Sequence, residues 1–131
     1  MIGRVIELGD DWKLHILGLS HGDAFLRLIR TPAGIKNRTW VELDRMGTKV
    51  ARRIADECDD LIKAHEMDSY HEVVLKETEQ REFLVTLTTD DDLGFIIDVD
   101  VDPVLIRIVI PSEGTIREIQ QVLRDVAEEL A

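Results

Sequence analysis

The chain carries one pattern twice. Residues 12–64 align with residues 81–131 with a single gap, and this alignment places Phe25 over Phe95 ahead of two segments of helical periodicity. A duplicated unit constrains the architecture strongly, because each copy exposes an apolar face that it cannot bury alone. We therefore expect one domain with internal pseudo-symmetry.

Each copy is expected to be four antiparallel strands followed by one helix. Apolar residues first alternate or run in short strand-length stretches separated by turn residues, and the period then changes to that of an amphipathic helix. The fold class that follows is α+β, with a first unit at residues 1–65 and a second at residues 66–131 of a single domain 1–131. Strands are expected at residues 2–8, 12–19, 24–30, 38–43, 72–76, 82–88, 94–101 and 104–110, and helices from residues 44 and 111.

The composition, and an N-terminal sequence without a charged segment followed by a long apolar run, indicate a soluble cytoplasmic protein. Apolar residues make up 44% of the chain and charged residues 33%, which is typical of a globular domain. No apolar run approaches the ~20 residues that a membrane span needs, so no membrane partner is expected. Cys58 is the only cysteine, which excludes a disulfide within the chain and predicts a packed side chain in the first helix.

The charge is distributed unevenly between the two units. The net charge is −11, yet residues 1–65 contain 11 basic and 10 acidic side chains, whereas residues 66–131 contain 5 and 17. A strongly acidic protein repels nucleic acid as a whole, so any anion is expected to bind the balanced first unit. The acidic unit then either meets a basic partner or simply keeps the surface solvated.

A basic and aromatic surface is expected on the first sheet. Side chains two residues apart on a strand share a face, which groups Lys13 with His15, Phe25 with Arg27, and Arg38 with Trp40 and Glu42. Cations that follow a phosphate backbone and rings that stack on bases suit single-stranded nucleic acid. The alternative is that the rings cover core and the cations are solvated. If the faces coincide, the surface comprises Arg4, Lys13, His15, Phe25, Arg27, Arg38 and Trp40, with Lys36 added from a loop.

The segment Gly34 to Leu43 carries a family resemblance. Its run Gly-Ile-Lys-x-Arg-x-Trp-Val-x-Leu, feeding a helix after four strands, resembles the transcriptional positive cofactor family of single-stranded DNA binders. Two such units in one chain are similar to the Whirly and Pur-repeat proteins, which bind single strands on exposed sheet surfaces. The resemblance implies DNA contacts by Lys13, Arg27, Lys36, Arg38 and Trp40.

The second unit departs from this pattern. In the alignment, Asp98 and Asp100 stand opposite Leu28 and Arg30, so at most the first unit is expected to bind. The function predicted is non-enzymatic binding of single-stranded nucleic acid, of a kind that serves transcription, without a cofactor or a metal. The residues assigned to it are Lys13, His15, Phe25, Arg27, Lys36, Arg38 and Trp40.

Two further classes stay open. An acidic interaction module, such as an adaptor, an inhibitor, a chaperone or an immunity-type protein, would dock through the second unit onto a basic protein. A metal-dependent phosphodiesterase would use the alternating Asp98, Asp100 and Asp102, although the glycine and glutamate spacing of a calcium loop is missing. No nucleophile elbow or phosphate loop is present, so no catalytic residue is assigned. An exposed sheet edge or the second helix is a candidate surface for a homodimer.

Overall fold

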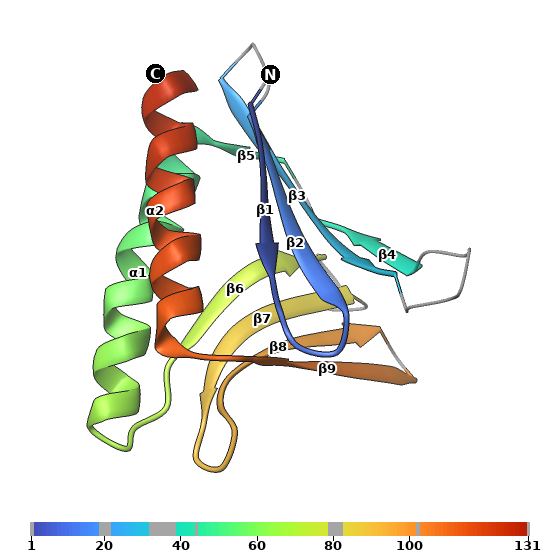
Figure 1. Ribbon diagram of the computed structural model, residues 1–131, viewed down its shortest axis with the longest axis vertical. Helices are drawn as coiled ribbons and strands as arrows, with labels where there is room; N and C mark the ends of the chain where they lie inside the picture. The colour runs from blue at the N-terminus through green and yellow to red at the C-terminus, as the bar shows by residue number, and fades with distance from the viewer. Residues whose placement is uncertain are drawn as a thin grey trace.

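Two twisted antiparallel sheets and two long helices surround one core in the computed structural model of the chain (Figure 1). The structure describes residues 2–18, 22–31, 39–43, 45–78, 83–101 and 103–130. The α+β class predicted from the sequence is confirmed, with four strands and a helix in the second half and the same pattern plus one short strand in the first.

The first half builds a sheet with the order β1-β2-β3-β4. A tight turn, Gly9-Asp10-Asp11, joins the first two strands, and Asp10 and Asp11 have the positive φ angles (54° and 64°) that are common in hairpin turns. A two-residue strand that the sequence pattern does not predict, β5, pairs with β3 just before the helix. The elements are β1 Ile2–Glu7, β2 Trp12–Gly18, β3 Asp23–Arg30, β4 Thr39–Glu42, β5 Met46–Gly47 and α1 Thr48–Glu66.

The second half repeats this order with a sheet β6-β7-β8-β9 and a final helix. Its first strand pair contains a bulge between Val74 and Lys76, whereas the β8–β9 register is continuous. The elements are β6 Glu72–Glu77, β7 Phe83–Asp90, β8 Gly94–Val101, β9 Val104–Ile110 and α2 Glu113–Leu130.

Each helix packs on the sheet of the other half, and α1 also contacts β3 and β5 of its own half. Helix α1 lies against β6 and β7, and α2 returns to lie against β1 and β2 (Figure 1). Gly18 on β2 approaches α2 closely, because a Cβ atom there would stand 3.2 Å from the Cγ1 atom of Val126. The two helices also pack on each other, so both halves contribute to one hydrophobic cluster.

The helical stripes explain this packing. The face of α1 predicted to be buried holds Ile54, Cys58 and Leu61, all of which are inaccessible. Val50, also predicted on that stripe, is 39% exposed and therefore lies outside it. The buried face of α2 also contains Gln120, which donates a hydrogen bond of 2.8 Å from Nε2 to the Ala55 carbonyl oxygen of α1.

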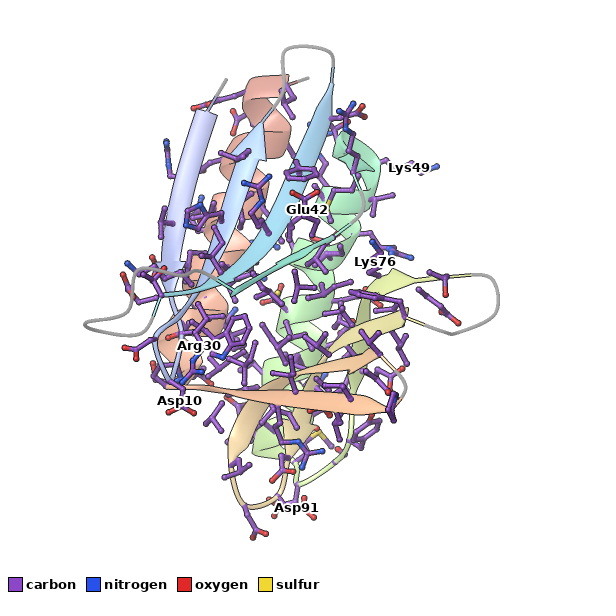
Figure 2. All side chains as sticks on the ribbon, turned by 90° about the vertical axis from the view of Figure 1, so that its right-hand side faces the viewer. Asp10, Arg30, Glu42, Lys49, Lys76 and Asp91 are labelled. Atoms are coloured by element: carbon purple, nitrogen blue, oxygen red, sulfur yellow. The ribbon has the colours of Figure 1, made fainter. Side chains whose placement is uncertain are left out.

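The sheets are joined at their edges. The β1–β2 turn reaches β9, where the Gly9 amide donates a hydrogen bond of 3.1 Å to the Val109 carbonyl oxygen. At the other side, Lys76 of β6 donates from Nζ to the Glu42 carbonyl oxygen of β4 at 3.2 Å, and Figure 2 shows the two residues close together. Neither of the described helices is long and apolar enough to cross a membrane.

Candidate functional site

The outer face of the first sheet is the side turned away from the two helices. Along β2 every second side chain is buried, with Leu14 and Ile16 in the core, so the residues between them point outward. The same alternation along β3 buries Leu26 and Leu28. The described outer face consists of Val5, Glu7, Lys13, His15, Leu17, Phe25, Arg27, Ile29 and Glu42.

Strand register brings four of the predicted site residues together. His15 lies opposite Arg27, and Leu17 lies opposite Phe25 on the same face. Lys13 lies opposite Ile29 in the next row. Lys13, His15, Phe25 and Arg27 therefore share one partly exposed surface, as the alternation of the sequence predicts.

Arg27 is the centre of this surface. Its Nη2 atom is 2.7 Å from Oε1 of Glu42 on β4, and its guanidinium carbon lies 5.3 Å from the centroid of the Phe25 ring. The cation is therefore held in place by a carboxylate on one side and by a ring on the other. Such a stacked guanidinium offers both a flat surface for a base and donors for a phosphate.

Lys13 is held more loosely. Its Nζ atom is 3.5 Å from Oε1 of Glu7, and both side chains are well exposed, so solvent screens the pair. Lys13, His15, Ile29 and Thr31 line a hollow of about 240 Å³ on this surface. Two acids, Glu7 and Glu42, thus stand beside the two cations, and the described part of the face is close to neutral.

Arg4 does not belong to this surface. It lies opposite Ile16, whose side chain is in the core, whereas Val5 takes the position beside His15. The expectation for Arg4 is wrong because neighbouring residues of a strand point to opposite faces. Its Nη1 atom instead donates to the Gly3 carbonyl oxygen at 3.1 Å.

Three of the assigned residues, Lys36, Arg38 and Trp40, belong to a segment that the structure describes in part. Lys36 and Arg38 lie outside the described residues. The backbone of Trp40 pairs with Ile29, a register position on the outer face, but its side chain also lies outside the described part of the chain.

The second sheet has an equivalent row of opposite polarity. Across the first sheet the row runs Val5, His15, Arg27, Glu42, and across the second it runs Val74, Thr86, Asp98, Arg107. In the first sheet the third strand, β3, supplies the cation Arg27. In the second sheet the third strand, β8, supplies the anion Asp98, which accepts a hydrogen bond of 2.9 Å at Oδ1 from Arg107 Nε.

This row corrects the alignment of the two halves. Phe25 points outward, whereas Phe95 is buried in the core. Asp98 consequently takes the place of Arg27, and the sequence alignment that sets it against Leu28 is shifted by one residue. A shift of one residue along a strand exchanges the two faces.

The carboxylates of the second half are used locally. Oδ1 of Asp90 accepts hydrogen bonds of 2.9 Å from the amides of Leu93 and Asp92, which hold the pKa of Asp90 below its ordinary value and shape the β7–β8 turn. Asp98 is engaged by Arg107, Asp100 is exposed, and Asp102 lies outside the described residues. Among the residues that the structure describes, no three metal-ligating side chains come together.

Cys58 offers no reactive thiol. It is fully buried in α1, and burial together with the charge of Asp59 raises the pKa of its thiol to about 12. Because the thiolate is the nucleophile, this cysteine is inert near neutral pH. The packed role predicted for it from the helical pattern is confirmed.

The acidic partner of Lys13 is one feature that the sequence analysis did not predict. The three-residue connection Gly9-Asp10-Asp11 places Leu8 opposite Trp12 and Glu7 opposite Lys13, so the hairpin register already contained this pairing. A comparison with known protein families, with curated proteins and with solved structures found no significant match, so the functional assignment of the outer face depends on its geometry.

Proposed function

We propose that the chain is a non-enzymatic, cytoplasmic protein that binds single-stranded nucleic acid on the outer face of the first sheet. The observation that carries this proposal is the meeting of Lys13, His15, Phe25 and Arg27 on one face of adjacent strands. Aromatic rings and guanidinium planes on an open sheet accept unpaired bases, whereas a duplex hides its bases from such a surface.

Binding exchanges one partner of Arg27 for another. A phosphate takes the place of the Glu42 carboxylate, and a base stacks on the plane that Phe25 and Arg27 form. If Lys13 and Arg27 each neutralise one phosphate, the logarithm of the binding constant falls with that of the salt concentration with a slope of about −1.4. The net charge of −11 makes this affinity modest.

The test is fluorescence anisotropy of a labelled oligothymidylate and of a matched duplex at low salt. The variant Lys13→Ala/Arg27→Ala should lose single-strand binding. Its control is Lys49→Ala/Arg53→Ala, which removes the same charge from an exposed part of α1. Equal losses in both variants, or no binding by the native protein at tens of micromolar, would refute the proposal.

Glu42 supplies a second, opposite test. Glu42→Gln removes the competitor of the phosphate and should tighten binding, whereas Asp60→Asn on exposed α1 changes the net charge equally and should change the affinity far less. If the effect came only from the net charge, both variants would change the affinity for single-stranded nucleic acid by the same amount.

A second candidate is an acidic protein-interaction module that docks through the second half. Residues 66–131 contain 17 acidic and 5 basic side chains, and their sheet exposes Val104 and Leu105. Replacing Asp98 and Asp100 by asparagine should abolish partner binding under this function, while leaving nucleic-acid binding intact.

A further inference from the structure

The outer side of β9 is an exposed strand edge. The second sheet has the order β6-β7-β8-β9, so among the described strands β9 is paired on one side only, with β8. On its other side the described residues provide one backbone hydrogen bond, from the Gly9 amide to the Val109 carbonyl oxygen. Residues 104–108 extend beyond that contact.

The backbone of this edge has hydrogen-bonding groups available. The Val109 carbonyl points away from β8, and alternation along an antiparallel strand turns the backbone groups of Arg107 and Leu105 the same way. Those of Ile106 and Ile108 turn toward β8 instead. Two residues therefore present a donor and an acceptor each to an incoming strand.

The side chains at this edge are apolar and exposed. Val104 is 54% exposed and Leu105 is 58% exposed, on opposite faces of β9, and Val101 lies beside Val104 in the register. Arg107, the one charge within the strand, is fixed on Asp98 by bonds of 2.9 and 3.3 Å. An added strand would thus find apolar contacts on both of its faces.

The opposite edge of the same sheet is protected. A bulge between Val74 and Lys76 interrupts β6, and Lys76 reaches across to the Glu42 carbonyl of the first sheet. Bulges, lysines and a covering element are the usual means by which proteins block edge pairing. Residues 104–108 of β9 have no bulge, no lysine and no proline.

Acidic residues flank the exposed edge at both ends. Asp100 lies opposite Leu105 in the register and is exposed, and Asp10 and Asp11 stand exposed on the turn that meets Val109. Arg30 is the cation at that end, with Nε donating to the Asp10 carbonyl oxygen at 3.1 Å. Figure 2 shows Asp10 and Arg30 at the end of β9.

We propose that the outer edge of β9 binds an extended segment of another protein, rich in lysine or arginine and in β-branched residues, as an added strand. Backbone hydrogen bonds supply the affinity of such a complex, and alternate side chains supply its selectivity. The acids at both ends of the edge select a basic segment. This gives the second candidate function a site, and it is independent of nucleic-acid binding on the first sheet.

A second copy of the chain fits this edge poorly. Pairing two β9 edges would bring together two molecules that each carry a net charge of −11, with the acids of each near those of the other. Like charges placed directly opposite destabilise a strand pair. The expected occupant is therefore a segment of the opposite charge.

The test uses a labelled, end-blocked peptide, Lys-Val-Thr-Val-Lys-Val-Thr-Val-Lys, titrated with the full chain and followed by anisotropy. The matched peptide with glutamate in place of every lysine should bind at least about tenfold more weakly, the effect of about 1.4 kcal/mol. Equal binding of the two peptides, or no binding of the basic one at hundreds of micromolar, would overturn the proposal.

Amide hydrogen exchange of the complex locates the peptide without any substitution. The amides of Leu105 and Arg107 should exchange more slowly when the peptide is added, whereas those of Ile106 and Ile108, already bonded to β8, should not change. Protection elsewhere with none at Leu105 and Arg107 would place the peptide on another surface and refute the assignment.

Two variants complete the experiment. Leu105→Pro removes an outward donor and should weaken peptide binding, while Leu105→Ala keeps the donor and should retain more of it. Lys13→Ala/Arg27→Ala should bind the peptide as the native chain does. A dimer in sedimentation experiments on the native protein that Leu105→Pro dissociates would assign the edge to a second copy and overturn the proposal.

Discussion

At the scale of single residues, Gln120 is the polar group on which the packing of the two helices depends. Its buried amide donates to the Ala55 carbonyl oxygen and its Oε1 accepts from Arg117 Nη1 at 3.2 Å. Gln120→Leu keeps the volume but removes these two bonds and the hydrogen bond to the Asp59 carboxylate, and we expect the free energy of unfolding to fall by about 1–2 kcal/mol.

Urea unfolding followed by circular dichroism measures this loss. The neighbouring Gln121 is exposed, so Gln121→Leu should change the free energy of unfolding by less than about 0.5 kcal/mol. Equal effects of the two substitutions would show that the buried bonds contribute nothing.

Asp59 of α1 makes the contact between the two helices dependent on pH. Hydrogen bonds from Gln120 and Arg117 hold the pKa of Asp59 below its ordinary value of 3.8. A carboxyl whose pKa is lower in the folded state stabilises the fold above its ordinary pKa, and that contribution is lost as the pH falls. Native protein should therefore be more stable than Asp59→Asn at neutral pH, with a difference that shrinks in acid.

Urea midpoints of both proteins across the acid range test this prediction. Asp60→Asn is the control, since Asp60 is exposed and forms no ion pair with the described residues. If the difference in stability between the native protein and Asp59→Asn stays constant with pH, the ionised Asp59 carboxylate is not what stabilises the native fold.

At the scale of elements, the β1–β2 hairpin is attached to β9 through Gly9. A Cβ atom at this position would stand 2.5 Å from the Val109 carbonyl oxygen, so Gly9→Ala must push the turn away from the strand. We expect this substitution to reduce the free energy of unfolding by about 1–3 kcal/mol. Gly47→Ala is the control, because a Cβ atom there has no neighbour within 4 Å.

Thermal and urea unfolding of the two alanine variants make this comparison. Similar stabilities for both would mean that the hairpin turn adapts freely to a side chain. Hydrogen exchange of the backbone amide at position 9, which bonds to the Val109 carbonyl oxygen in the native protein, should be faster in Gly9→Ala if the turn has detached from β9.

The elements themselves were largely predictable from the sequence. Strict alternation along β2 and turn residues on either side of it determine both its limits and its faces. For this reason Lys13, His15, Phe25 and Arg27 were correctly grouped on one surface. Arg4 was misplaced because its strand is only weakly alternating, and β5 is too short to leave a periodic signal.

Other features depend on contacts between distant segments. The continuous apolar run at the start of β8 reads equally well in either register, so matching Phe95 with Phe25 gave the wrong face. Burial of Gln120 has no local signal, because it follows from the approach of α1. The ion pair between Arg27 and Glu42 likewise requires the β3–β4 register.

At the scale of the whole molecule, the exchanged helices make the two halves interdependent. Helix α1 packs on β6 and β7 of the second sheet as well as on β3 and β5, and α2 packs on the first sheet, so each half alone would leave much of its sheet and of its helix uncovered. We expect fragments 1–67 and 68–131 to be largely unfolded when separate, and to regain the native circular dichroism spectrum when mixed.

The intact chain should accordingly unfold in one cooperative transition, with coincident curves from circular dichroism and tryptophan fluorescence. A stable, cooperatively unfolding fragment of either half would contradict this interdependence. Two separate transitions of the intact chain would do the same.

The reversed ion pairs of the two sheets show what covalent linkage of the halves permits. In a symmetric dimer of a single β4α chain, every substitution would appear on both outer faces at once. Joining the units in one polypeptide releases that constraint, and one sheet then carries Arg27 where the other carries Asp98. One scaffold can thus present two chemically opposite surfaces, each free to acquire its own partner.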